Sequence, residues 1–455
     1  MTVVPALSVE PAATDARPSA PLTIGGFGDP GTLLLSGPTA TPEGEDLAGH
    51  SQRWGLLPDL DGAGVRALLR DSRLDGRGGG GFPVSRKVET ARMSPGHAVV
   101  IVNASESEPI SRKDRALCTQ RPHLVLDGAA LLARALDVDE VVVHVHRGPA
   151  SASGALSLAM AIRRAARLPD PGWRLSEGPD RYVSGESSAV AGYVDGGEAR
   201  PRFTDRPLAV AGPSGRPTVV SNAETVAQLA VLARIGPMAW NALGAPSSPG
   251  PRLVTLAGAV TRPGRVLELT GPGTIGDLLA ADGVPGPPAA VLVGGFAGTW
   301  IRGDEAWQTP FSRESLDCLG ASPGCGLLAV LPHGGCGLLE TARIVRYLAG
   351  ESAGQCGTCV AGLPRLAEDM EALAGGALRR RGLRKMSALA DTVLGSGACG
   401  HPDGVVRLIR STLDVFADDV VRHLAGSPCR GGADPPILLV PDPAPGPRTD
   451  PGGWA

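Results

Sequence analysis

The sequence has 455 residues, which suffices for several domains of roughly 100–200 residues each. Its 43 basic and 46 acidic residues give a net charge of −3, so no charge excess favours nucleic acid or a membrane surface as a partner. No apolar run approaches the roughly 20 residues that span a bilayer. The eight cysteines are too sparse for a disulfide scaffold. We therefore expect a cytoplasmic protein without a direct membrane span.

The two ends of the chain have the composition of unpacked segments. Residues 1–50 lack sustained apolar periodicity and are rich in Pro, Ala and Thr, which predicts an extended or disordered lead-in. Residues 431–455 form a Pro/Gly-rich tail that is expected to be unpacked, apart from its apolar ILLV stretch. Function is therefore expected between these two ends.

Residues 51–243 have the alternating pattern of an α/β domain. A helix is expected to begin after Asp61 and to lead into the glycine cluster GRGGGGFP. Strand and helix then alternate, with predicted elements at 98–104 (strand), 122–136 (helix), 140–147 (strand) and 222–236 (helix, with an Asn cap). This succession favours a parallel sheet.

Two smaller domains are predicted after a linker-like break at 244–251. Residues 250–320 combine short strands, a Pro-Gly turn and one short helix, which predicts a small β-rich domain. Residues 333–430 contain segments of helical periodicity separated by Gly-rich turns and cysteine motifs. They predict a small helical bundle.

Four polar or glycine-rich loops of the α/β domain have features of nucleotide-binding loops. The cluster GRGGGGFP fits G-x-G-x-x-G, whose glycines let backbone N–H groups approach a phosphate. NASESEP directly follows a buried strand, where open α/β sheets place ligands. YVSGESSAV and GRPTVVSNAET are further loops of this type. Each loop taken singly has an alternative reading as an ordinary turn, but the four together favour a nucleotide-like ligand.

The order of the motifs resembles one known family. GRGGGGFP-x3-K, NASESEP-x4-DR, GES-x-AV, PTVV-x-NAET and ES-x-GQCGTC occur in the order seen in the flavoprotein subunit of respiratory complex I, the NADH:quinone oxidoreductase. Related subunits of NAD-linked hydrogenases and formate dehydrogenases share this architecture. The resemblance implies an α/β fold with a Rossmann-like FMN-binding domain, a small β-grasp (soluble-ligand-binding) domain and a C-terminal four-helix iron–sulfur domain.

The resemblance also implies contacts with FMN and NADH. The FMN phosphate would meet amides of the glycine loop, and Lys87 would add positive charge. Phe82 matches an aromatic residue near which NADH stacks on the flavin, and Glu108 matches an acidic residue beside it. Carried over by position, the FMN-binding residues are Gly76, Arg77, Gly78, Gly79, Lys87, Asn103, Gly185, Glu186, Asn222 and Thr225.

Several departures from the family concern NADH. Ser105 stands where the family usually has Asp, and Ser187 stands where it has a second Glu. The family's PR-x-KPPFP segment reads PRFTDRPLA here, with Thr204 and Pro207 in place of a Lys and a Phe. An alternative is therefore an FMN protein that uses a ferredoxin or another donor in place of NADH.

The cysteines Cys356, Cys359 and Cys399 match ligands of an iron–sulfur cluster. The usual SCG-x-C-x-x-C reads SAGQCGTC, with Ala353 where the first Cys belongs. A four-iron cluster (4Fe-4S) normally takes four thiolates, so three Cys imply a fourth ligand of another kind, a three-iron cluster (3Fe-4S) or loss of the cluster. Ser352 or a neighbouring Cys such as Cys336 is a candidate substitute.

The residues alone leave other interpretations of the cysteines open. Cys356, Cys359 and Cys399 with His401 would make a Cys₃His zinc site, or the C-x-x-C pair would be unligated thiols. The strand histidines His144 and His146 suit a surface or core strand better than a metal pair. The cysteines without ligand spacing are expected to pack as small apolar residues; they are Cys118, Cys318, Cys325 and Cys429.

These patterns predict an oxidoreductase subunit that transfers electrons through FMN and an iron–sulfur cluster. NADH or a related two-electron donor would reduce FMN, and single electrons would leave through the cluster to an iron–sulfur or ferredoxin-like partner subunit. A different alternative is a degenerate subunit that acts as a scaffold and conducts no electrons.

Overall fold

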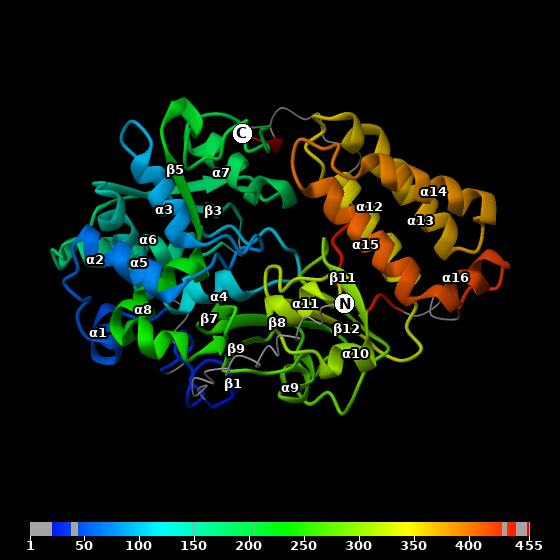
Figure 1. Cartoon of the computed structure of the whole chain (residues 1–455), viewed down its shortest axis with the longest axis horizontal. Helices are drawn as coiled ribbons and strands as arrows, with labels where there is room; N and C mark the ends of the chain where they lie inside the picture. The colour runs from blue at the N-terminus through cyan, green and yellow to red at the C-terminus, as the bar shows by residue number, and fades with distance from the viewer. Residues whose placement is uncertain are drawn as a thin grey trace, which may run out of the picture.

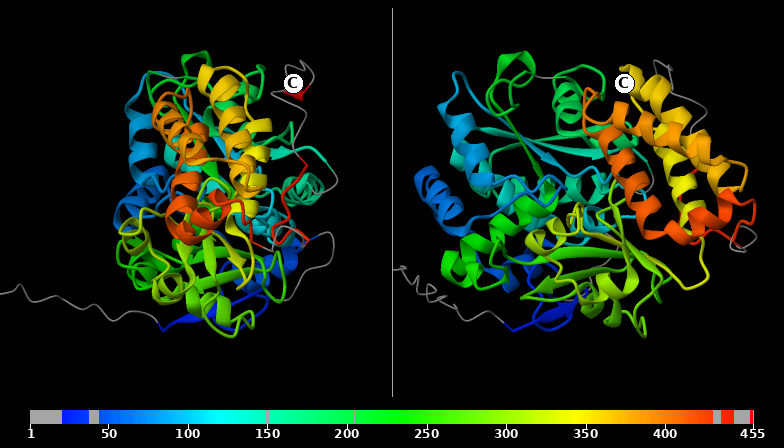
Figure 2. Two further views of the ribbon diagram at one scale, coloured as in Figure 1. Left: turned by 90° about the vertical axis from the view of Figure 1, so that its right-hand side faces the viewer. Right: turned by 45° about the vertical axis from the view of Figure 1, so that its right-hand side comes forward.

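The computed structural model describes residues 21–37, 44–148, 151–203, 205–429, 435–442 and 453–454. Figures 1 and 2 show a parallel-sheet part, a mixed-sheet part and a helical part, which pack against one another. The parallel sheet has four strands in the order β4-β3-β2-β5. Their bounds are β2 (Val99–Asn103), β3 (Glu140–His146), β4 (Gly172–Gly178) and β5 (Thr218–Asn222).

Apolar residues alternate along these strands, so both faces of the parallel sheet are covered. Val100 and Val102 pack into a large core with helices α5 (Pro122–Leu136) and α8 (Ala223–Asn241). Ile101 faces the opposite side, where it packs with Val190 of α7. The other elements of this part are α1 (Leu47–Trp54), α2 (Gly62–Ser72), α3 (Val84–Met93), α4 (Lys113–Gln120), α6 (Ser153–Ala165), η1 (Tyr182–Gly185), α7 (Ser187–Val194) and η2 (Pro213–Gly215).

The predicted local elements of the α/β part are confirmed. Helix α2 begins after Asp61, whose side chain accepts from the Gly64 N–H and caps the helix. Asn222 caps α8 in the same way through Glu224 N–H. Gly236 has a φ of 77°, so α8 is kinked there rather than continuous to Asn241. The short helices α3, α4 and α7 and the strands β4 and β5 were not predicted from the sequence.

The second sheet is mixed and has six strands in the order β1-β9-β8-β12-β10-β11. Strands β8 and β12 pair in parallel, and the other neighbours pair antiparallel. Because β1 and β12 belong to this sheet, it extends beyond the predicted range 250–320 at both ends. The strands are β1 (Thr23–Gly25), β8 (Arg252–Gly258), β9 (Val266–Thr270), β10 (Ala290–Val293), β11 (Thr299–Arg302) and β12 (Leu327–Leu331).

The predicted lead-in is wrong over its described part. Residues 1–20 and 38–43 lie outside the described residues. Between them, β1 pairs with β9, and the side chains of Leu34 and Leu35 are fully buried. The buried carboxylate of Glu268 accepts hydrogen bonds from the backbone N–H groups of Leu33, Leu34 and Leu35 at 2.9–3.1 Å. A long-range carboxylate therefore orders a segment whose own composition is that of a loop.

Five helices form the third part, at the right of Figure 1. They are α12 (Gly337–Gly350), α13 (Leu363–Ala374), α14 (Arg380–Val393), α15 (His401–Val415) and α16 (Ala417–Leu424). Their apolar faces share one core with the mixed sheet. Short elements complete the fold: β6 (Gly244–Ala245), β7 (Ser248–Pro249), α9 (Ile275–Ala280), α10 (Gly303–Gln308), α11 (Arg313–Asp317) and the π-helical turn η3 (Thr358–Gly362).

The C-terminal tail is packed where it is described. Leu438 of the ILLV stretch is buried in the core of the helical part, in agreement with the exception made for that stretch. Trp454 is also fully buried, which the tail's composition did not indicate. It packs with Val183 and Ala353, and Arg181 lies over its ring at 4.5 Å from the centroid. Within the described part of the chain, no helix has the length and apolar character that crossing a membrane requires.

Candidate functional site

The candidate site begins where the order of the parallel strands changes direction. The chain proceeds from β2 to β3 and β4 on one side of the sheet and then returns to place β5 on the other side of β2. Asn103 and Asn222, the last residues of β2 and β5, are paired across this point. The loops after these two strands diverge, and in open α/β sheets the crevice between such loops binds ligands.

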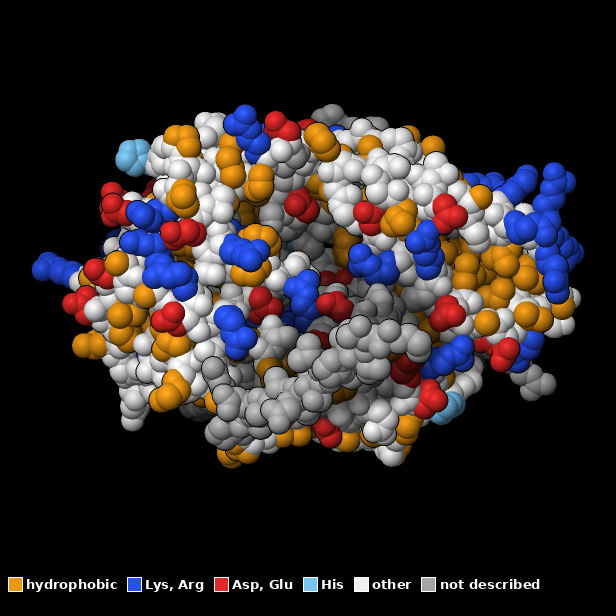
Figure 3. Space-filling view, viewed as in Figure 1, with side chains coloured by type: hydrophobic (Ala, Val, Ile, Leu, Met, Phe, Trp, Pro, Cys, Tyr) orange, Lys and Arg blue, Asp and Glu red, His pale blue; other side chains and the backbone are white. Residues whose placement is uncertain are grey.

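A cavity of about 680 Å³ lies at this crevice, within the size range of small-molecule sites. The parallel-sheet part, the loops around Gly294 and Gly324 of the mixed-sheet part and the start of α15 all contribute to its wall. Figure 3 shows a hollow between the parallel-sheet part and the helical part. The cavity is lined by the predicted residues Gly76, Gly78, Gly79, Phe82, Lys87, Asn103, Glu108, Gly185, Glu186, Asn222, Thr225 and Cys399.

Arg77 was carried over as an FMN contact, but it is not among the residues that line the cavity. The guanidinium is completely buried away from the cavity, where it pairs with Asp75 at 2.7 Å and donates to Ser248 Oγ and Pro249 O. Only the backbone of Arg77 serves the loop, because its N–H donates to Thr225 Oγ1 at 2.8 Å. Arg77 therefore anchors the glycine loop, and G-R-G spacing cannot distinguish an anchoring arginine from one that contacts the ligand.

A buried ion-pair network holds Asn222 in place, and a backbone carbonyl holds Asn103. Lys113 Nζ lies 2.9 Å from carboxylate oxygens of both Asp114 and Glu224. Asp114 accepts from Asn222 Nδ2 at 2.8 Å, and Asn103 Nδ2 donates to Gly185 O at 2.8 Å. Asp114 is part of the motif NASESEP-x4-DR, but the role of Lys113 and Asp114 in fixing Asn222 was missed because it depends on a contact between α4 and β5.

Lys87 is the lysine that lines the cavity. It projects from α3, and its Nζ donates to Val220 O at 2.8 Å. Burial lowers the pKa of Lys87, and no carboxylate pairs with it among the described residues. An anionic group in the cavity would supply the counter-charge that this ammonium group lacks.

The wall of the cavity fits a polar ligand of the size of FMN. A Cβ atom at Gly185 would lie 1.9 Å from Ser107 Oγ, and one at Gly78 would lie 3.1 Å from Asn222 Cβ, so a side chain at either position would crowd the residue opposite it. Among the described residues, four buried polar atoms of the wall have no hydrogen-bond partner: Ser105 Oγ, Ser107 Oγ, Glu108 Oε1 and His401 Nδ1. Since buried polar atoms are normally paired, these atoms mark places for ligand groups.

Glu108 and Phe82, the predicted NADH contacts, lie on the same cavity. Phe82 exposes 51% of its surface, as expected of a ring placed for stacking. Glu108 Oε2 accepts from Phe296 N–H at 2.8 Å and from the Tyr182 hydroxyl at 3.4 Å. Burial raises the pKa of Glu108 to about 8, so the residue is largely a neutral carboxylic acid at pH 7.

The three predicted cluster cysteines converge beside this cavity. Cys356 and Cys359 flank the start of the η3 turn, and Cys399 precedes α15 and lines the cavity itself. Burial, with the Cys356 and Cys399 thiols nearby, raises the pKa of Cys359. Although burial acts in the opposite direction, hydrogen bonds from Thr358 and from Ala398 N–H lower the pKa of Cys356. Donors aimed at a sulfur suit a thiolate ligand.

The structure reduces the number of residues that could be the fourth ligand of the iron–sulfur cluster. Cys336 stands just before α12 and Ala353 just beyond its end, and the 14-residue helix between them spans about 21 Å. Cys336 is therefore excluded. The hydroxyl of Ser352 is buried and has no hydrogen-bond partner among the described residues, and the same holds for His401 Nδ1. His401 Nε2 donates to Leu348 O at 2.8 Å, which leaves the Nδ1 lone pair available.

The structure also bears on the zinc and packing interpretations of the cysteines and on the role of the two strand histidines. The only described group of three or more potential ligands within 4.8 Å of one another contains Cys336, His423 and Cys429. The Cys₃His set does not meet that spacing, so a single zinc ion there is not supported. Cys429 packs against the core of the helical part, as expected, and also belongs to this group of potential ligands. His144 and His146 are buried strand residues, as expected.

Comparisons with known proteins agree with this geometry. Residues 69–231 match the family described as Nuo51 FMN-binding domain, and residues 340–423 match the NADH-ubiquinone oxidoreductase-F iron-sulfur binding region. An NADH-quinone oxidoreductase subunit of Mycobacterium tuberculosis (strain ATCC 25618 / H37Rv) is 29% identical over 91% of this chain and 96% of its own length. The NAD-reducing hydrogenase HoxS subunit alpha of Cupriavidus necator is 28% identical over 79% of this chain and 61% of its own.

A solved structure supports the same assignment. The NAD+-reducing [NiFe]-hydrogenase in its H2-reduced state superposes with a TM-score of 0.74 at 29% identity, over 80% of this chain. The chain corresponds to 63% of the length of that hydrogenase chain. The two matched regions contain the glycine loop, both asparagine loops and all three cluster cysteines. The chain is therefore similar, over most of its length, to flavoprotein subunits of NADH-quinone oxidoreductases and of related NAD-linked hydrogenases.

Proposed function

We propose that this chain is an electron-transfer subunit that binds FMN and an iron–sulfur cluster, oxidises NADH and passes single electrons to a partner protein. The observation that supports this most directly is one cavity lined by the glycine loop, both strand-end asparagines and Cys399. A flavin in that cavity would lie beside the cysteine group without an intervening domain. When bound, FMN supplies the exchange between two-electron and one-electron chemistry.

Each polar group of the wall has a part in this proposal. The loop residues Gly76, Gly78 and Gly79 would present backbone N–H groups to the phosphate, and Lys87 would neutralise part of its charge. Asn103 and Asn222 would orient the ring or ribityl chain, and the unpaired hydroxyls of Ser105 and Ser107 would bond it. The remaining proposed contacts are Gly185, Glu186 and Thr225. No side chain need act as a nucleophile.

The part of the cavity around Phe82 and Glu108 supports NADH as the electron donor, but two carboxylates of the family are replaced there. Phe82 is exposed for stacking, and the neutral form of Glu108 adds no negative charge near a nicotinamide nucleotide. Ser105 and Ser187 line the same cavity in place of two carboxylates. Thr204 lies outside the described residues. These substitutions favour a second candidate function, in which the FMN protein uses a ferredoxin or another electron donor in place of NADH.

Three cysteines provide a partial ligand set for the cluster. Cys356, Cys359 and Cys399 would hold three irons, and the fourth position of a 4Fe-4S cluster would need Ser352 Oγ or His401 Nδ1. With neither, the same three thiolates suit a 3Fe-4S cluster. In both cases the hydrogen bonds to Cys356 lower the pKa of its thiol, although burial acts in the opposite direction.

The proposed layout is a Rossmann-like FMN-binding domain, a β-grasp domain and a four-helix iron–sulfur domain. It is supported by the parallel four-stranded sheet, the mixed sheet with its parallel β8–β12 pair, and helices α12 to α15. We place the protein in the cytoplasm because all eight cysteines are free thiols in the structure. Its proposed partner is an iron–sulfur or ferredoxin-like subunit, since the relatives named above are themselves subunits.

One spectroscopic experiment tests the proposal. The full chain is purified anaerobically, FMN and iron are quantified, and absorbance spectra are recorded before and after addition of NADH and then dithionite. We expect bound FMN and iron, with flavin absorbance bleached by NADH. Cofactors that respond to dithionite but ignore NADH would select the second candidate. A protein without either cofactor would contradict both and favour the scaffold alternative.

A further inference from the structure

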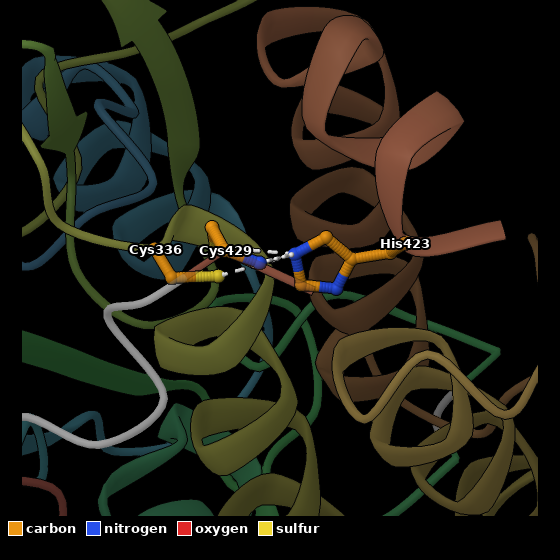
Figure 4. A group of neighbouring side chains, drawn as sticks. All are labelled: Cys336, His423 and Cys429. Carbon is orange, nitrogen blue, oxygen red and sulfur yellow. Dashed lines mark hydrogen bonds between the residues drawn. The ribbon is translucent and has the colours of Figure 1, made fainter. Parts of the chain in front are cut away.

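A second group of potential metal ligands lies outside the candidate electron-transfer site. Cys336 immediately precedes α12, His423 lies in the last turn of α16, and Cys429 follows that helix. Figure 4 shows the imidazole of His423 directed toward both cysteines. His423 Nε2 lies 3.1 Å from Cys429 Sγ and 3.9 Å from Cys336 Sγ, and the three ligand atoms lie within 4.8 Å of one another.

The hydrogen bonds of His423 prepare Nε2 as the ligand atom. Nδ1–H donates to Leu373 O at 3.1 Å, because a carbonyl oxygen can only accept. Nε2 therefore carries the lone pair, and it accepts from Cys429 N–H at 3.0 Å. A backbone carbonyl that fixes one ring nitrogen while the other faces ligands is the usual outer-shell arrangement of a metal-binding histidine. A bound metal would take over the lone pair from the Cys429 N–H.

The spacing of the three atoms corresponds to one tetrahedral ion. Zinc–sulfur bonds of about 2.3 Å and zinc–nitrogen bonds of about 2.0–2.1 Å place sulfur and nitrogen ligands about 3.6 Å apart and two sulfurs about 3.8 Å apart. The two observed sulfur–nitrogen distances, 3.1 and 3.9 Å, bracket this value. We propose that Cys336, His423 and Cys429 form a Cys₂His site for a zinc ion.

The fourth position of the proposed site faces solvent. Cys336 and His423 are buried, whereas Cys429 is partly exposed and lines a cavity of about 680 Å³. The carboxylates of Asp304 and Asp419 line the same cavity. A zinc ion enters from this side and completes its tetrahedron with a water molecule, as zinc sites with three protein ligands do.

This site is separate from the proposed iron–sulfur ligands. Cys336 and the Cys356 loop lie at opposite ends of α12, about 21 Å apart for a helix of 14 residues. The zinc ion would link the start of α12 to the end of α16, which are the first and last helices of the helical part. Its effect would be on the stability of that part, while electron transfer would not pass through it.

Metal binding at this site is an acid–base exchange without electron transfer. Zn²⁺ forms one bond to each sulfur and one to Nε2, while the two S–H bonds break and two protons pass to solvent. The imidazole need release no proton, because Nε2 accepts from the Cys429 N–H and so presents a lone pair. Affinity for zinc should therefore increase with pH.

Metal analysis of the full-length protein tests the proposal. Zinc and iron are quantified in protein purified anaerobically after growth with added zinc, and zinc K-edge X-ray absorption defines the ligands. We expect stoichiometric zinc with two sulfur ligands and one imidazole. His423→Ala and the double variant Cys336→Ala with Cys429→Ala should lose the zinc and retain iron. His423→Cys should retain zinc, since a thiolate replaces the imidazole.

The matched control removes a thiol elsewhere. Cys318→Ala changes an exposed cysteine and should leave the zinc content unchanged. Zinc that persists in His423→Ala, a spectrum with four sulfur ligands, or wild-type protein that neither contains nor takes up Zn²⁺ would overturn the proposal. A Cys336–Cys429 disulfide found by mass spectrometry of the alkylated native protein would do the same. If the variants do not fold, the zinc K-edge X-ray absorption spectrum of the wild-type protein alone tests the proposal.

Discussion

Arg181 and Glu351 form a buried ion pair that joins the two halves of the proposed electron path. Arg181 Nε donates to Glu351 Oε2 at 3.0 Å, and Tyr182 N–H donates to the same oxygen at 2.9 Å. Tyr182 begins the turn that leads to Gly185 in the FMN cavity, and Glu351 stands two residues before Ala353 in the cysteine loop. One carboxylate oxygen thus fixes the cavity wall relative to the cysteine loop.

Glu351→Ala should destabilise the protein, because it leaves the Arg181 guanidinium buried without its carboxylate. Removal of one partner of a buried pair typically costs about 3–5 kcal/mol in the free energy of unfolding. Chemical denaturation measures this loss. The control is Glu371→Ala, which breaks a half-exposed pair with Arg346 and should cost about 1 kcal/mol or less. Equal losses in the two variants would contradict the structural role of Glu351.

Lys87→Met should weaken the binding of FMN. The substitution removes a partly buried cation beside the cavity and one charge-assisted hydrogen bond to the ligand, worth about 1.5–3 kcal/mol. The dissociation constant of FMN, measured by fluorescence quenching on reconstitution, should rise roughly 10-fold to 100-fold. Lys385→Met changes an exposed lysine of α14 and should leave the constant unchanged. If Lys87→Met binds FMN with the affinity of the wild type, the FMN phosphate does not lie beside Lys87.

Glu108→Gln should change how stability depends on pH. Because the pKa of Glu108 in the folded protein, about 8, lies above its ordinary value of 4.5, the folded state keeps a proton that the unfolded chain releases. The free energy of unfolding of the wild type should therefore fall as pH rises from about 4.5 to about 8. The variant lacks this contribution, so the difference between the two proteins should change by at most about 5 kcal/mol across that range.

Urea denaturation from pH 5 to pH 9 measures this difference. Glu177→Gln alters an exposed carboxylate and serves as the control, with a difference from wild type that should stay nearly constant. A parallel pH dependence of wild type and Glu108→Gln would mean that Glu108 is ionised in the folded state.

Ala353→Cys should supply the thiolate that the cysteine loop lacks. We expect anaerobically purified variant protein to hold more iron per chain and to show the paramagnetic resonance spectrum of a four-iron cluster with four thiolates. Ala361→Cys adds a thiol at an exposed position of the η3 turn and should match the wild type. Identical iron content and spectra in wild type and Ala353→Cys would show that another residue already completes the cluster.

The local elements of the α/β part were predictable because their causes are local. Asp61 and Asn222 cap helices through neighbouring N–H groups, and the β-branched run before Asn103 forms a strand in any context that buries it. The lead-in was mispredicted for the opposite reason. Its order depends on Glu268, more than 230 residues away, which no local pattern reveals.

The sequence by itself determined which residue types line the candidate cavity and the cysteine loop beside it, since glycines, strand-end asparagines and closely spaced cysteines leave recognisable patterns. Tertiary structure decided which of them face the cavity. Arg77 turns away from the cavity because its guanidinium pairs with Asp75 and donates to Ser248. Cys336 cannot reach the cysteine loop because the whole length of α12 lies between them. It also brought Cys336 and Cys429 to His423, 87 and 6 residues away along the chain. Spacing in sequence limits distance only within an element, whereas packing between elements places such groups together.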